Sequence, residues 1–94
     1  MSAEALLVKM SDFMALPEPE IMRKGLFSLI EKEIRLAEYE IANIRERYEV
    51  FSLSALYDAI QNGSVPEHPA WEDYIVWKNK EAHINKLRNL AEEG

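Results

Sequence analysis

The chain has 94 residues, a formal net charge of −6 and no cysteine. Its length fits one domain, and the missing thiols exclude disulfides, thiolate nucleophiles and thiolate metal sites. The acidic balance makes nucleic acid an unfavourable partner and a basic protein surface a better one. No apolar run reaches the ~20 residues that cross a bilayer, and the N-terminus resembles no signal peptide. We therefore expect a cytoplasmic protein that makes no use of a membrane.

Helix-forming residues dominate the long segments, while three glycines and four prolines leave little material for strand turns. The sequence therefore predicts an all-α fold in one domain, residues 1–94, with a helical hairpin or bundle. Caps and breakers divide the chain into four expected helices. These cover residues 1–16, 17–50, 52–62 and 70–92.

The second of these helices is long for a chain of this size. A helix of ~30 residues measures about 45 Å, whereas a compact chain of 94 residues is about 30 Å across. Gly25 is its weak point, because glycine costs about 1 kcal/mol against alanine inside a helix. Either the helix breaks at Gly25, or a second chain covers its ends.

Apolar residues in the long helix recur at alternating steps of three and four, which is a heptad pattern. Its a positions are Phe27, Ile34, Ile41 and Tyr48, and its d positions are Ile30, Ala37 and Ile44, with Phe51 as a final d residue. We call this set the heptad seam. A seam of this kind is covered by another helix, so it indicates packing and names no chemistry.

Two partners compete for the heptad seam. An antiparallel homodimer would bring Glu31 towards Arg45, since the flanks of the seam are acidic first and basic last. The fourth helix, folded back as a hairpin, would instead bring Lys78 and Lys80 near Glu38 and Glu40. Both arrangements can hold together in a bundle of two chains. We predict a homodimer in isolation.

The chemistry-bearing residues give no pattern of an active site. His68 and Glu72 are four apart and could share a metal, but acidic residues in a first helical turn more simply favour the helix dipole. No serine sits in a nucleophile elbow, and neither a phosphate loop nor a dinucleotide fingerprint is present. We expect no enzyme, no metal and no cofactor.

Aromatic residues gather at the start of the fourth helix, beside acidic ones. A partner-binding surface is predicted there, because an aromatic anchor inside an acidic rim suits a basic protein surface. Its residues are His68, Trp71, Asp73 and Tyr74. The alternative is that Trp71 closes the end of the helical core while the acids only cap the helix.

Residues 21–90 resemble a loosely defined family of short, all-helical prokaryotic proteins found in archaea and cyanobacteria. The resemblance rests on three stretches. They are Glu46-Arg47-Tyr48-Glu49-Val50, the segment from Ser52 to Gly63, and Glu67-His68-Pro69-Ala70-Trp71-Glu72-Asp73. Glu49 departs from the pattern, where the family usually has glycine.

Several proteins of this family are similar to the antitoxin half of toxin–antitoxin pairs. The resemblance therefore implies a non-enzymatic interaction module that restrains a toxin-like protein partner. The alternative is a small structural or regulatory helical subunit, or a homo-oligomer, with no toxin partner.

Overall fold

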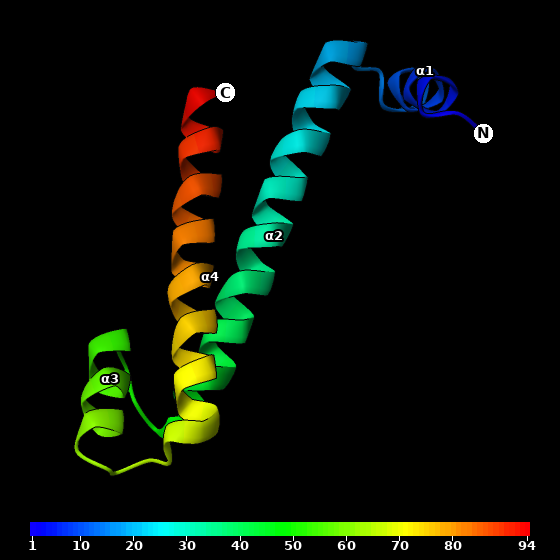
Figure 1. Ribbon diagram of the computed structural model, residues 1–94. Coiled ribbons are helices and arrows are strands. Elements are labelled where there is room, and N and C mark those ends of the chain that lie inside the picture. Colours follow the sequence, from blue (N-terminus) through cyan, green and yellow to red (C-terminus); the bar gives the residue numbers. More distant parts are fainter. The chain divides into compact units, whose positions relative to one another are not determined.

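The computed structural model describes residues 1–94 as four helices with no strand (Figure 1). The helices are α1 (Ala3–Met14), α2 (Glu18–Tyr48), α3 (Leu53–Gln61) and α4 (Glu67–Glu93). The predicted all-α fold with one long helix is thereby confirmed. None of the four helices combines the length and the apolar character that crossing a membrane would need. The chain forms two compact units, residues 1–32 and residues 33–94, and α2 contributes to both.

The N-terminal unit contains α1 and the first half of α2. Ser2 caps α1, because its hydroxyl accepts a hydrogen bond from the Ala5 amide at 3.1 Å. The helix ends with Ala15 in the left-handed region, at φ 55°. Pro17 then starts α2, since its carbonyl accepts the Ile21 amide at 3.1 Å. Ile21 is the only buried residue of this unit.

The long helix α2 passes through Gly25 without a break. It ends in a Schellman motif, in which the Val50 amide donates to the Arg45 carbonyl at 3.1 Å and the Glu49 amide to Glu46 at 3.3 Å. Glu49 occupies the left-handed position, at φ 53°. The prediction that the heptad seam extends to Phe51 is wrong. The Schellman motif ends the helix at Tyr48 and turns the chain away, and the Phe51 side chain is 92% exposed.

In the second unit, α4 runs antiparallel to the C-terminal half of α2 (Figure 1). Three ion pairs show this direction, because the residue numbers of the α4 partners rise as those of the α2 partners fall. They are Arg47–Asp73 at 2.7 Å, Glu40–Lys80 at 3.1 Å and Glu38–Arg88 at 3.1 Å. The predicted proximity of Lys80 to Glu40 is confirmed. Glu38 pairs with Arg88, which the sequence had not indicated.

One hydrophobic core joins α2, α3 and α4. Its buried members are Ala37, Ile41, Ile44, Leu56, Ile60, Ala70, Trp77 and Ile84. Trp77 and Leu56 have no exposed surface at all. On α4 the buried residues are spaced by seven, which keeps them on one face of the helix. The second unit is therefore a helical hairpin of α2 and α4, with α3 packed at the end where the chain connects them.

The left-handed Glu49 predicts an unusual effect of substitution. A residue with a side chain costs about 1–2 kcal/mol in this conformation, and glycine costs far less. We expect Glu49→Gly to raise the free energy of unfolding by about 1 kcal/mol, as measured by urea unfolding. Glu46→Gly is the matched control, because it places glycine in the last turn of α2 and should lower stability by about 1 kcal/mol. Equal losses in the two variants would contradict this explanation.

Candidate interaction site

The short helix α3 positions one side of the candidate site. Ser52 caps it, with its hydroxyl accepting the Ala55 amide at 3.1 Å. Its buried face, Leu56 and Ile60, packs into the core. Tyr57 follows Leu56 and therefore points to the outer side, where it is 42% exposed. Gly63, at φ 79°, ends the helix and turns the chain towards α4.

Three aromatic rings from α3 and α4 form a closed cluster, which we call the aromatic triad: Tyr57, Trp71 and Tyr74. Tyr57 and Trp71 meet edge to face at 5.7 Å between ring centroids, and Trp71 and Tyr74 do so at 5.6 Å. Tyr57 and Tyr74 are 5.8 Å apart in a tilted arrangement. Trp71 and Tyr74 are half-buried against the core. The triad thus joins α3 to α4 and still presents ring surface to solvent.

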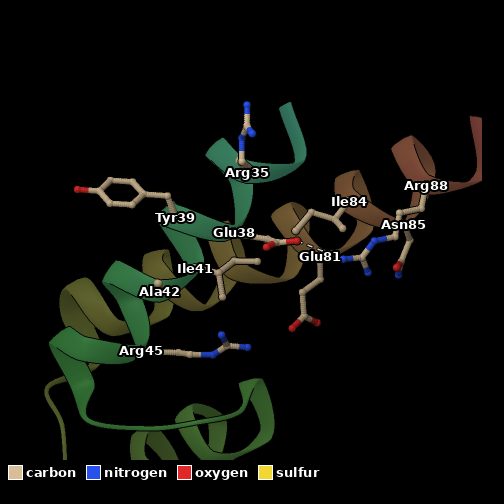
Figure 2. A pocket seen from close by; sticks show the side chains of 10 residues that line it. All are labelled: Arg35, Glu38, Tyr39, Ile41, Ala42, Arg45, Glu81, Ile84, Asn85 and Arg88. Carbon is tan, nitrogen blue, oxygen red and sulfur yellow. Dashed lines mark hydrogen bonds and ion pairs between the residues drawn. The ribbon is translucent and has the colours of Figure 1, made fainter. Parts of the chain in front are cut away.

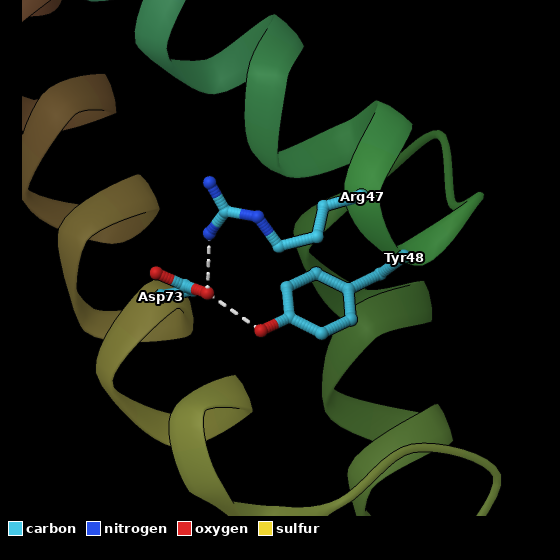
Figure 3. A network of polar contacts seen from close by, with 3 residues as sticks. All are labelled: Arg47, Tyr48 and Asp73. Atoms are coloured by element: carbon cyan, nitrogen blue, oxygen red, sulfur yellow. Dashed lines mark hydrogen bonds and ion pairs between the residues drawn. The ribbon is translucent and has the colours of Figure 1, made fainter.

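Asp73 ties the first turns of α4 to the end of α2 (Figure 3). Its carboxylate accepts hydrogen bonds from the Arg47 guanidinium at 2.7 Å and the Tyr48 hydroxyl at 2.5 Å. Only 17% of the Asp73 side chain is exposed. The Asp73 carboxylate therefore binds Arg47 and Tyr48 of its own chain, whereas the sequence analysis predicted it on the partner-binding surface.

This network shifts the pKa values of both donors. Partial burial raises the pKa of the Tyr48 hydroxyl, and the hydrogen bond to Asp73 raises it further. The Asp73 carboxylate raises the pKa of Arg47. At physiological pH the arrangement is thus a neutral phenol and a charged guanidinium on one carboxylate.

His68 lies at a kink near the start of α4, with non-helical angles of φ −113° and ψ 128°, and its ring meets Glu72 in the helical turn that follows. The Nδ1 atom of His68 lies 2.9 Å from a Glu72 carboxylate oxygen, and both side chains are well exposed. The backbone amide of Glu72 lowers the pKa of that carboxyl group, and His68 lowers it further. No group of three His, Cys, Asp or Glu side chains lies within reach of a common ion.

The heptad seam divides between the two units. Ala37, Ile41 and Ile44 are buried in the core, with Ile34 and Tyr48 partly buried against it. Phe27 and Ile30 belong to the N-terminal unit and are partly exposed. The C-terminal half of the seam is therefore covered within the chain, by α3 and α4.

A groove between α2 and α4 was not indicated by the sequence (Figure 2). It is open, with a volume of about 810 Å³, and three arginines line it: Arg35, Arg45 and Arg88. Arg88 reaches across to Glu38, and Arg45 donates to the Phe51 carbonyl at 3.1 Å while lying 5.3 Å from the Trp77 ring centroid. Arg35 and Arg45 are both on α2, and only the hairpin brings Arg88 of α4 to the same groove, so spacing along the sequence does not predict it.

The fold and the site define an all-α helical-hairpin protein with an aromatic cluster at the closed end of the hairpin. The chain belongs to the family described as the uncharacterized protein MJ0235 family, whose model matches residues 1–93. The match includes the N-terminal helix as well as the hairpin. No curated protein and no solved structure matches the chain.

The raised pKa of Tyr48 predicts how stability responds to alkali. A group whose pKa is higher in the folded state stabilises the fold below its unfolded value, near 10, and loses that contribution as the pH rises through the folded value. Tyr48→Phe should cost about 1–2 kcal/mol at pH 8, because the hydrogen bond to Asp73 is lost. It should then lose less stability than the natural chain between pH 9 and 11.

Tyr39→Phe is the control, since Tyr39 is 67% exposed. It should keep the alkaline loss of the natural chain in urea unfolding at each pH. A Tyr48→Phe variant with the same alkaline loss as the natural chain would contradict the role given to this hydroxyl.

Proposed function

We propose that the protein is a non-enzymatic interaction module, antitoxin-like, which binds and restrains a basic protein partner in the cytoplasm. The observation that carries the proposal is the aromatic triad at the closed end of the hairpin. Trp71 meets both tyrosine rings edge to face, and Tyr57 remains 42% exposed. Rigid, partly exposed aromatic rings are the residues that anchor protein interfaces, because they bury large areas at little entropic cost.

The charge of the segment that carries the aromatic triad favours a basic partner. Residues 49–77 contain five acidic side chains and neither lysine nor arginine. Asp73 is paired with Arg47, which leaves Glu49, Asp58, Glu67 and Glu72 exposed without a lysine or arginine partner. An acidic rim of this kind attracts a basic surface and rejects an acidic one. We call the triad and these four acidic residues the acidic–aromatic surface.

The absence of an enzymatic role and of a cofactor is part of the same proposal. No polar or charged side chain is buried in the chain. Acid–base and nucleophilic catalysis generally use groups whose pKa is shifted by burial or by close charges in a cleft. Here Ser52 serves as a cap and Asp73 as a tether, which accounts for both residues structurally.

A second candidate function is that of a small structural or regulatory subunit. The N-terminal unit favours it, because this unit buries only Ile21 and leaves large apolar side chains in solvent. Such a surface suits assembly rather than recognition of a basic partner. The gene neighbourhood distinguishes the two candidates, since a toxin-like neighbour favours the interaction module.

The paired variant Glu67→Lys with Glu72→Lys tests the proposed function. Both residues are exposed, so the variant should keep the fold, but it reverses the rim charge next to Trp71. We expect the partner recovered by affinity purification from native cells to bind the purified variant at least tenfold more weakly, by calorimetry. Each lost or reversed rim charge disfavours a basic surface.

Glu92→Lys with Glu93→Lys is the matched control, because it makes the same charge change at the far end of α4. It should bind as the natural chain does. Equal affinity of both double variants, or equal weakening in both, would refute the acidic–aromatic surface as the binding site.

A further inference from the structure

We propose that the N-terminal unit, residues 1–32, is a self-association surface, through which α2 pairs with α2 of a second copy in an antiparallel crossing at Gly25. The starting observation is the number of uncovered apolar side chains. Nine large hydrophobic residues of this unit are exposed, and Ile21 alone is buried. The nine are Met1, Leu6, Val8, Met10, Phe13, Met14, Met22, Leu26 and Leu29. Exposed apolar side chains in such number, against one buried residue, favour an interaction surface in this unit.

Within this unit, α2 carries a definite apolar stripe. Met22, Leu26 and Leu29 recur at steps of four and three, so they share one face of the helix. Their exposed fractions are 54%, 61% and 54%. We call these three residues with Gly25 the glycine stripe.

The opposite face of α2 in this unit is mainly polar, which is the pattern of a helix with one face in solvent. Arg23 lies over the Phe27 ring at 5.0 Å and shields it. A shallow groove of about 530 Å³ runs along this face, lined by Glu20, Arg23, Lys24, Phe27, Ser28 and Glu31. A partner helix therefore gains apolar contact on the glycine stripe and not on the face behind it.

Gly25 makes room for such a partner helix. A Cβ atom placed on Gly25 would meet no atom within 4 Å, and the residue has ordinary helical geometry. Nothing inside the chain therefore requires a glycine here, although glycine weakens a helix. A close helix–helix approach does require one, because the missing side chain lets two backbones come near.

The charges on the same side of α2 are self-complementary about Gly25. Glu18 lies seven residues before Gly25 and Lys32 seven residues after it. Seven residues are nearly two turns, so all three stand in one line along the helix. In an antiparallel two-fold crossing at Gly25, Glu18 of each copy meets Lys32 of the other. Neither residue has an ion-pair partner within its own chain.

The overall charge also favours a second copy over a foreign partner at this surface. Residues 1–32 carry five acidic and four basic side chains, a net charge of −1. Residues 33–94 carry twelve acidic and seven basic side chains, a net charge of −5, so hairpins of two copies repel each other. The nearly neutral N-terminal unit is thus where two copies can meet.

A glycine substitution tests the crossing. Gly25→Gln fits the isolated chain, since no atom is in its way, and it improves helix propensity. It should nevertheless weaken self-association at least tenfold, because its side chain holds the two helices apart. The measurement is multi-angle light scattering with analytical ultracentrifugation, on the full chain at micromolar concentration. The natural chain should show twice the 10.9 kDa chain mass.

Glu20→Gln is the matched control, because it places the same side chain on the polar face of the same helix, five residues and more than a third of a turn away from Gly25. It should leave the dimer mass and the dissociation constant unchanged. Circular dichroism of both variants reports whether the helices persist. A natural chain of single-chain mass, or a folded Gly25→Gln variant that dimerises normally, would overturn the proposal.

A charge exchange tests the antiparallel register independently. Glu18→Lys and Lys32→Glu should each weaken self-association roughly tenfold, since each places like charges opposite each other. The double variant restores opposite charges at both contacts and should recover the natural dissociation constant. Additive weakening in the double variant would overturn the pairing at Gly25. All of these variants leave residues 49–77 unchanged, so partner capture by the acidic–aromatic surface can succeed or fail separately.

Discussion

The hairpin depends on the packing of Trp77. This side chain has no exposed surface and lies at the junction of α2, α3 and α4. Its indole N–H donates to Glu81 at 2.8 Å, and the Arg45 guanidinium lies 5.3 Å from its ring centroid. Removing a buried tryptophan typically costs about 3–5 kcal/mol, which is a large share of the roughly 5–15 kcal/mol that holds a domain folded. Trp77 and Leu56 are the largest fully buried side chains of the chain.

Arg45 extends this interaction to the turn that follows α2. The same side chain that covers the Trp77 ring donates to the Phe51 carbonyl at 3.1 Å. The carbonyl group of Arg45 also accepts the Val50 amide in the Schellman motif. The core and the chain reversal are therefore coupled through one residue. That coupling allows the left-handed Glu49 to be tolerated, because the surrounding contacts fix the turn.

Exposed ion pairs set the direction of the hairpin more than its strength. Each such pair contributes about 0–1 kcal/mol, but Arg47–Asp73, Glu40–Lys80 and Glu38–Arg88 all favour the same antiparallel alignment. Arg47–Asp73 has a further consequence for function. It engages Asp73 within the chain, whereas Glu49, Asp58, Glu67 and Glu72 of the proposed acidic–aromatic surface are exposed.

Much of this structure is readable from the sequence, because helix periodicity and caps are local signals. The prolines and the serine caps predict the four helices that the structure contains. The heptad seam, in contrast, does not show which helix covers it, because α4 of the same chain and a helix of another chain can both bury an apolar stripe. Its C-terminal half turns out to be covered by the chain itself.

The candidate site was harder to predict, because its meaning lies in contacts between distant segments. Trp71 was expected to be an exposed anchor or a core residue, and it is half-buried in an aromatic triad whose third ring, Tyr57, comes from α3. Asp73 engages residues 25 and 26 positions earlier in the chain. No spacing rule along a single helix connects such pairs, so only the fold shows which acids remain free.

The hairpin buries its own core, and we propose that a second copy covers the N-terminal unit. Hydrogen exchange of the full chain at two protein concentrations tests this division most directly. Amide protection in residues 18–32 should rise with concentration, while protection around Trp77 and Ile84 in α4 should stay constant. Protection of residues 18–32 that is the same at both concentrations, well below and well above the dimer dissociation constant, would contradict the account.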